Sequence, residues 1–297
     1  MNLKKNLPIL ILLFFASCKK LTVDQLAFPS STTEKYELEN YDAGEQSVPA
    51  AYDIPVSNRT ILTFTSIDKS TGETYKIYGL YIGNINTIAQ DTILLYCHGQ
   101  SLNMDIYYPR TRLLAHLNET VNRGVLMFDF RGYGMSEGTP DEAGLAEDMD
   151  AAINWLIAKN ANPSNVIYYG YSLGCIPVID RAAYRTDFQP KKIILESPLA
   201  SVENLANSST IINLHPAFIS NLRFNNAEKI KDVKVPLLWI HGVEDDYIAI
   251  ENGELVYQNH QGTYKKAIRV ENAKHGDIPK IMGYTTYLEA IHNFLLN

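Results

Sequence analysis

Short apolar runs recur along the chain after residue 59 and predict the strands of one sheet. The first two, at 61–67 and 74–83, are joined by the turn-like sequence Lys69-Ser70-Thr71-Gly72 and predict an antiparallel pair. The later runs are shorter and almost continuously apolar, as strands are when helices cover both faces of a parallel sheet. These runs lie at 92–99, 125–132, 166–172, 192–198, 236–242 and 265–273.

Helical patterns lie between these runs. Residues 141–160 place Leu145, Met149, Ile153 and Leu156 at helical spacing and carry acidic residues near the start of the segment. Two further helices are predicted, from Leu173 to about Tyr184 and over 279–297. Because strands and helices alternate, we expect one α/β domain over 51–297, with a mostly parallel, doubly wound sheet flanked by helices.

One interval interrupts this alternation. Residues 199–234 contain apolar side chains but no clear strand. A long insertion before a later strand often forms a lid or a short helical cap over a site, and a long helical crossover would fit the same pattern equally well. Both interpretations stay open from the sequence.

The first eighteen residues resemble the leader of a bacterial lipoprotein. Lys4 and Lys5 precede an apolar run from Leu7 to Ala16, which is too short to span a bilayer but suits a signal peptide, and Cys18 follows a pair of small residues. We expect residues 1–17 to be a cleaved signal peptide and Cys18 to carry a lipid, although an ordinary secretory signal would also fit. We expect the polar residues 18–50 to form a tether and a lead-in to the folded domain. The protein is therefore expected to be exported and held at a membrane of the cell envelope through Cys18.

Charge and cysteine content narrow the possible partners. The 297 residues contain 26 Lys and Arg against 33 Asp and Glu, a formal net charge of −7, and no long basic run. This balance argues against a nucleic-acid partner. Cys97 and Cys175 both end apolar runs, and we expect two buried free thiols, although export would permit a disulfide.

The sequence Gly170-Tyr171-Ser172-Leu173-Gly174 ends a predicted strand and begins a predicted helix. A Gly-x-Ser-x-Gly motif at such a junction describes a nucleophile elbow, in which a strained turn presents the serine and glycines leave room for close backbone approach. The pentapeptide alone is weak evidence, because a serine also caps helices well. The rest of the chain must supply the partners that the chemistry needs.

Those partners occur downstream in the order serine, aspartate, histidine. A hydroxyl becomes a good nucleophile only when an imidazole can take its proton and a carboxylate orients that imidazole. Asp245 follows one predicted parallel strand and His275 follows the next, so both belong at the carboxyl edge of the sheet with Ser172. Asp246 and Glu196 are alternative carboxylates.

Five motifs in this order resemble the serine α/β-hydrolase superfamily, over about residues 60–297. They are "YCHGQS" at 96–101, "DFRGYGMSEG" at 129–138, "GYSLGC" at 170–175, "LESP" at 195–198 and "HGVEDDYI" at 241–248, and together they look like the small hydrolases with a short cap, among them esterases and serine aminopeptidases. The resemblance implies Ser172 as the nucleophile, His275 as the general base and acid, and Asp245 as its orienting carboxylate. Asp245 is preferred to Asp246 because the family's His-Gly-x-x-Asp spacing falls on it, and Glu196 is then expected to be structural. No metal or organic cofactor is implied.

Other roles follow from the same resemblance. The backbone N–H groups of Gln100 and Leu173 are expected to form the oxyanion hole. His98, Asp129 and Arg131 are expected to be structural, with Gly132 and Gly134 allowing a bend.

The predicted reaction is acyl transfer to water, with a small-molecule or lipid ester as the expected substrate. A peptidase or aminopeptidase would use the same machinery, but the predicted cap offers Glu203 and Glu228 without an obvious cluster of carboxylates to hold a substrate amine. A hydrolase-fold binding protein without activity is a further alternative. A dinucleotide is not expected, because "YCHGQSLNM" at 96–104 lacks the G-x-G-x-x-G pattern.

Overall fold

The computed structural model describes residues 28–40, 48–117, 123–204 and 222–297. The predicted signal peptide at 1–17 and the lipid-bearing Cys18 lie outside these ranges. Within them, every helix is too short or too polar to cross a lipid bilayer.

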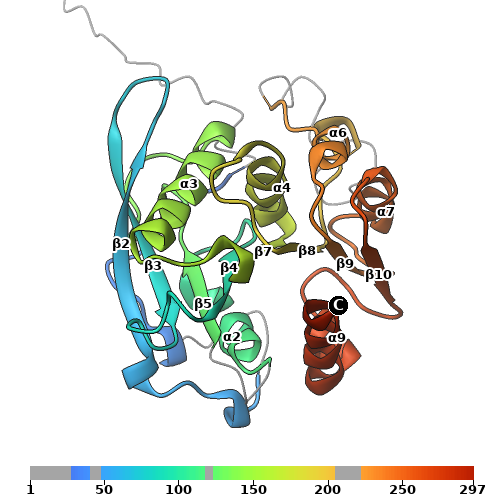
Figure 1. Ribbon diagram of the computed structural model, residues 1–297, viewed down its shortest axis with the longest axis horizontal. Helices are drawn as coiled ribbons and strands as arrows, with labels where there is room; N and C mark the ends of the chain where they lie inside the picture. Colours follow the sequence, from blue (N-terminus) through green and yellow to red (C-terminus); the bar gives the residue numbers. More distant parts are fainter. Residues whose placement is uncertain (1–27, 41–47, 118–122, 205–221) are drawn as a thin grey trace, which may run out of the picture.

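An eight-stranded sheet forms the centre of the molecule (Figure 1). The strand order is β10-β9-β8-β7-β4-β5-β3-β2. β2 and β3 form an antiparallel hairpin, β3 is antiparallel to β5, and the remaining neighbours are parallel. The strands are β2 Arg59–Ile67, β3 Thr74–Ile82, β4 Thr92–Cys97, β5 Arg123–Phe128, β7 Val166–Tyr171, β8 Lys192–Glu196, β9 Leu237–Gly242 and β10 Lys265–Val270. The predicted α/β fold is confirmed.

Helices cover both faces of the sheet. In Figure 1, α3 Glu142–Ala158, α4 Cys175–Tyr184, α6 Asn226–Lys229 and α7 Ile250–Asn259 lie on one side, with α2 Met104–Ala115 and α9 Tyr284–Leu296 on the other. A short helix, α8 Ile278–Met282, precedes α9, and the predicted single helix over 279–297 is split because Gly283 adopts a φ of +84°.

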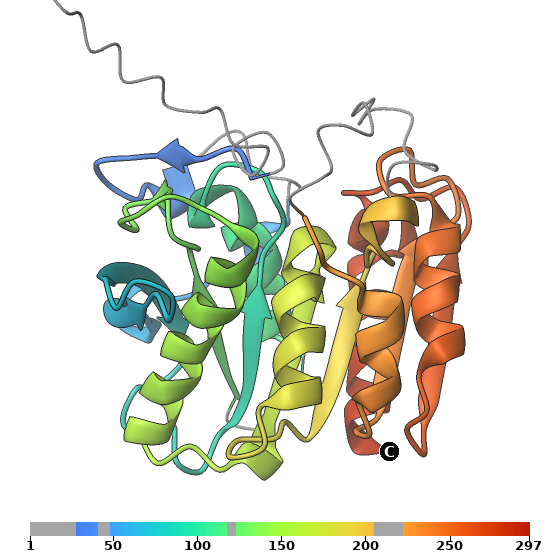
Figure 2. The same ribbon diagram turned by 90° about the horizontal axis from the view of Figure 1, so that it is seen from above.

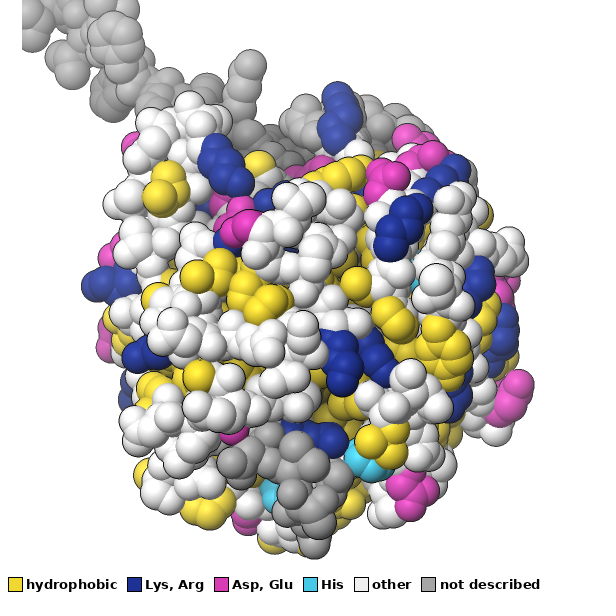
Figure 3. Space-filling model, in the orientation of Figure 1, with side chains coloured by type: hydrophobic (Ala, Val, Ile, Leu, Met, Phe, Trp, Pro, Cys, Tyr) yellow, Lys and Arg dark blue, Asp and Glu magenta, His cyan; other side chains and the backbone are white. Residues whose placement is uncertain are grey.

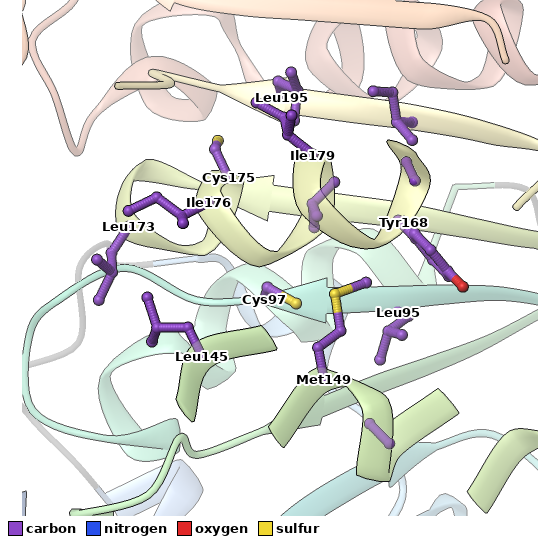
Figure 4. Packing of buried hydrophobic residues seen from close by; sticks show 14 of the residues in the cluster. Leu95, Cys97, Leu145, Met149, Tyr168, Leu173, Cys175, Ile176, Ile179 and Leu195 are labelled. Carbon is purple, nitrogen blue, oxygen red and sulfur yellow. The ribbon is translucent and has the colours of Figure 1, made fainter. Parts of the chain in front are cut away.

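Alternate residues of each central strand fill the two halves of the core. Leu95 and Cys97 of β4 face α3 and α4, where they pack with apolar side chains such as Met149 and Ile179 (Figure 4). Leu94 and Tyr96 of the same strand pack on the opposite face with α2 and α9. Both faces are buried, which explains why the sequence of these strands is continuously apolar.

Cys97 and Cys175 are buried free thiols, as predicted. Burial raises the pKa of both groups, so they are held in the neutral form. They act as small apolar side chains in the core between the sheet and α4 (Figure 4).

Part of the predicted insertion at 199–234 lies outside the described residues, namely 205–221. The described remainder after residue 222 forms α6 and a 3-10 turn at Ile230–Asp232, which pack against α4 and α7 on the flank of the sheet. These residues form a crossover. The cap stays a prediction for the middle of the interval.

The tether and lead-in predicted for 18–50 is in part a component of the folded domain. A two-residue strand, β1 Ser31–Thr32, pairs in parallel with β6 Tyr133–Gly134. The ring of Phe28 is 2% exposed and belongs to the core. The polar composition of this segment concealed these contacts, which are all distant in the sequence.

On the face of the molecule seen in Figure 3, Lys and Arg side chains are interspersed with acidic ones.

Candidate active site

Ser172 lies in a strained turn between β7 and α4. Its φ is +52°, a left-handed conformation that is costly for a residue with a side chain. A Cβ on Gly174 would lie 2.0 Å from the carbonyl oxygen of Cys97, and one on Gly170 would lie 2.7 Å from the backbone of Cys175. The two glycines therefore permit the close approach that the turn needs, as the motif predicted.

The structure brings His275 and Asp245 to this serine. His275 Nε2 lies 2.9 Å from Ser172 Oγ, and His275 Nδ1 lies 2.8 Å from Asp245 Oδ2. The aspartate lies in the loop after β9 and the histidine in the loop after β10, so three carboxyl ends of parallel strands supply the three groups. This is the geometry of a serine made nucleophilic by a histidine that a carboxylate orients.

Asp245 is held rigidly by hydrogen bonds to both carboxylate oxygens. Its Oδ1 accepts from the backbone N–H groups of Tyr247 and Ile248, at 2.9 and 2.8 Å. Its Oδ2 also lies 3.1 Å from Nε2 of His241, a buried side chain of β9. Burial alone would raise the pKa of Asp245, but the hydrogen bonds with His241 and His275 outweigh it and hold this pKa well below the usual range. The carboxylate therefore stays ionised beside the imidazole.

The alternative carboxylates have other surroundings. Asp246 is exposed and forms an ion pair with Lys274 at 3.1 Å. Glu196 is fully buried, where it is paired with Arg110 and accepts hydrogen bonds from Tyr169 and Tyr287. The structural role expected for Glu196 agrees with these contacts.

The loop that carries His275 is held by two residues that the sequence analysis did not single out. Tyr171 donates its hydroxyl hydrogen to the carbonyl of His275 at 3.1 Å, and Arg110 Nη2 donates to the carbonyl of Gly276 at 3.1 Å. The Arg110 guanidinium also lies 4.4 Å from the centroid of the Tyr171 ring. Arg110 belongs to α2, a helix that the hydrophobic pattern of the sequence did not predict.

The residues expected to form the oxyanion hole lie beside Ser172. Leu173 follows it at the start of the turn, and Gln100 lines the same cavity as Ser172 and His275. The loop around Gln100 is fixed by two tyrosines: Tyr107 Oη accepts from the N–H of Ser101 at 3.0 Å, and Tyr247 donates to Gln100 Oε1 at 2.7 Å.

Three polar residues are buried near the site and contact other parts of the fold, namely His98, Asp129 and Arg131. His98 Nδ1 lies 2.7 Å from the carbonyl oxygen of Gly99, and its Nε2 lies 3.2 Å from Asp129. Arg131 is paired with Asp148 and Glu147, two residues of α3. The bend after Arg131 uses φ values of +76° at Gly132 and +56° at Gly134.

The cavity at this site has a volume of about 670 Å³, which suits a small organic substrate. Among the described residues that line it, the side chains are mostly hydroxyl-bearing, aromatic or small: Pro29, Ser30, Ser31, Gly99, Gln100, Ser101, Leu102, Tyr107, Tyr171, Ser172, Asp246, Tyr247 and His275. Pro29, Ser30 and Ser31 come from the segment that the sequence assigned to a lead-in. Nowhere in the described ranges do three or more His, Cys, Asp or Glu side chains group as a metal site would require.

Comparisons with known proteins agree with the architecture. A family model described as "alpha/beta hydrolase fold" matches residues 92–229. Alpha/beta hydrolase domain-containing protein 17B from Homo sapiens is 31% identical over 205 residues, which cover 68% of this chain and 65% of the human protein. The chain thus spans just under two thirds of the length of that relative. Alpha/beta hydrolase domain-containing protein 17C from Xenopus laevis is 28% identical over 281 residues, which cover 92% of this chain and 84% of the relative.

Solved structures share the fold at low sequence identity. An esterase from Pyrococcus furiosus matches with a TM-score of 0.64 and 18% identity, covering 89% of this chain and 98% of that one. Est1E from Butyrivibrio proteoclasticus, solved with ferulic acid bound, matches with a TM-score of 0.63 and 16% identity. The match covers 78% of this chain and 97% of Est1E.

Proposed function

This chain belongs to the α/β-hydrolase superfamily, and we propose that within it the protein is a serine hydrolase that cleaves a carboxylic ester through an acyl-enzyme. The observation that carries the proposal is the hydrogen-bonded series from Ser172 through His275 to Asp245, at 2.9 and 2.8 Å. The esterases among the solved structures with this fold are consistent with it.

In the first half of the reaction, Ser172 Oγ attacks the carbonyl carbon of the ester while His275 Nε2 takes the hydroxyl proton. The imidazolium that forms is stabilised by the ionised Asp245. The tetrahedral intermediate collapses, the bond to the alcohol oxygen breaks, and His275 gives its proton to that oxygen. The alcohol leaves, and the acyl group stays on Ser172.

In the second half, water takes the place of the alcohol. His275 removes a proton from the water as its oxygen attacks the acyl-enzyme, and then returns that proton to Ser172 Oγ as the acid departs. In both tetrahedral intermediates the oxyanion accepts hydrogen bonds from the backbone N–H groups of Leu173 and Gln100. Such preorganised donors contribute about 3 to 4 kcal/mol each to the stabilisation of the transition state.

The charges at the cavity favour an ester over the substrate of an aminopeptidase. A substrate ammonium group would need carboxylates facing it, yet the one acidic side chain among the described lining residues is Asp246, which Lys274 already pairs. Glu203, Glu228 and Asp232, the acidic residues of the predicted cap, are exposed and do not line the cavity. A peptidase of the same fold is therefore the second candidate.

The test compares hydrolysis of p-nitrophenyl butyrate and of leucine p-nitroanilide by the purified protein. We expect the wild type to cleave the ester in preference to the amide, and Ser172→Ala to lower ester kcat by about a thousandfold or more. Ser164→Ala, at an exposed serine away from the cavity, is the matched control and should keep full activity. Preference for the amide would favour the peptidase, and unchanged ester cleavage by Ser172→Ala would refute the proposed nucleophile.

A further inference from the structure

Residues 28–36 cross the carboxyl edge of the sheet, the end toward which the strand arrows point in Figure 2, and we call this segment the strap. Three of its residues, Pro29, Ser30 and Ser31, line the cavity that also contains Ser172 and His275. We propose that the strap is a wall of the substrate site that limits the size of the group bound beside Ser172. This inference rests on the proposed function, because it concerns the specificity of that same site.

The strap is fixed at its first half by packing and by strand pairing. Phe28 is buried in the core, immediately before the three residues that face the cavity. β1 then pairs Ser31 with Tyr133 and Thr32 with Gly134, and the N–H of Thr33 donates to the carbonyl of Gly134 at 2.9 Å. A wall can select substrates by size only when it does not yield, and these contacts make the wall rigid.

The second half of the strap is fastened to the scaffold of the oxyanion loop. Tyr36 donates its hydroxyl hydrogen to Asp129 Oδ2 at 2.7 Å and accepts from the N–H of Met135 at 3.0 Å. Asp129 is fully buried and also faces His98, whose Nδ1 lies 2.7 Å from the carbonyl of Gly99. The wall and the loop that precedes Gln100 therefore share one set of buried polar contacts.

The chain continues from the strap onto α2. The backbone N–H groups of Glu37 and Leu38 donate to Asp105 Oδ1 at 2.9 and 2.6 Å, and Asp105 lies in the first turn of that helix. The strap is thus fixed at both ends and along its length. Its cavity-facing residues are small, so they leave room for substrate, and a larger side chain at Ser31 would occupy that room.

The test uses Ser31→Trp in the full chain with Thr32→Trp as the matched control. Both positions lie in β1, but Thr32 is exposed and does not line the cavity. Rates are measured with p-nitrophenyl acetate and p-nitrophenyl octanoate. We expect Ser31→Trp to lower the ratio of octanoate to acetate kcat/KM by about tenfold or more, and Thr32→Trp to leave that ratio unchanged.

Ser30→Trp is the second variant, because Ser30 is exposed and a large side chain there is compatible with folding. It should shift the ratio in the same direction. Active variants at both serines with the wild-type ratio would overturn the strap as a wall while leaving the proposed function intact. A wild type that cleaves neither ester would overturn the proposed function, and the wall with it.

Discussion

Asp245 and Asp246 are neighbours in the chain but have different surroundings. The first is buried, bonded to His275, and held by two backbone N–H groups. The second is exposed and paired with Lys274. At the scale of single residues, contact with the imidazole decides which carboxylate can orient it.

We therefore predict that Asp245→Asn lowers kcat by about a thousandfold to ten-thousandfold, because an amide neither fixes the tautomer of His275 nor stabilises its protonated form. Asp246→Asn, at the cavity-lining neighbour that Lys274 pairs, should lower kcat by less than about tenfold, since surface ion pairs of this kind contribute little. Steady-state ester hydrolysis by the two variants measures the difference. Equal losses in both would contradict the assignment of Asp245.

The residues of this site differ in how far the sequence could predict them. Ser172 ends one predicted strand, and Asp245 and His275 each follow another, so these positions were enough to predict that the three residues lie at one edge of the sheet. Arg110 and Tyr247 act through contacts with loops distant in the sequence, and no local pattern marks them. Tyr36 and Asp129 are 93 positions apart in the chain, and no local pattern predicts the hydrogen bond between them.

Among the elements, the central strands β4, β5, β7, β8 and β9 were predicted well because near-uniform burial makes them almost continuously apolar. α2 was not predicted. It contains Pro109 and buries polar side chains such as Asp105 and Arg110, so its sequence has no clear apolar stripe. The contacts of the strap were not predicted for a related reason. Backbone pairing and side-chain hydrogen bonds hold its polar residues in place, and these leave no apolar pattern in the sequence.

Helices α3 and α4 are joined by a cluster of charges centred on Asp150. Its carboxylate is paired with Lys69, Arg181 and Arg185, each at 2.9 Å. Burial would raise the pKa of Asp150, but Lys69 and Arg181 lower it below the ordinary value of 3.8. A carboxyl group whose pKa is lower in the folded state stabilises that state above its unfolded pKa, and the stabilisation is lost as the pH falls through the folded pKa.

We predict that Asp150→Asn lowers the free energy of unfolding at pH 7 by about 1 kcal/mol, a value that allows for the partial exposure of these groups. The difference in unfolding free energy between wild type and variant should be smaller at pH 3, because a carboxyl group with a lowered folded pKa contributes less stability once the pH is below its unfolded pKa. Urea denaturation at the two pH values measures this gap, with Glu251→Gln at an exposed position as the control. A gap of the same size at both pH values would exclude the ion pairs as its cause.

At the scale of the whole molecule, the fold assembles one site from segments far apart in the chain. Ser172 and His275, which are 103 positions apart, meet where β7 and β10 end, and the strap reaches the same place from the other end of the sequence. The parallel sheet makes this convergence possible because its carboxyl ends share one edge. The lipid anchor at Cys18 stays a prediction of the sequence.

We infer that Ser172 is an activated nucleophile in the folded protein, and reaction with a fluorophosphonate tests this inference. The labelled protein is measured by intact mass and then by peptide mapping, for the wild type, for Ser172→Ala and for wild type unfolded in urea before the reaction. We predict a single label on the folded wild type, located on Ser172, and none on the other two samples. A folded wild type that takes no label, or a Ser172→Ala variant labelled to the same extent, would contradict the account.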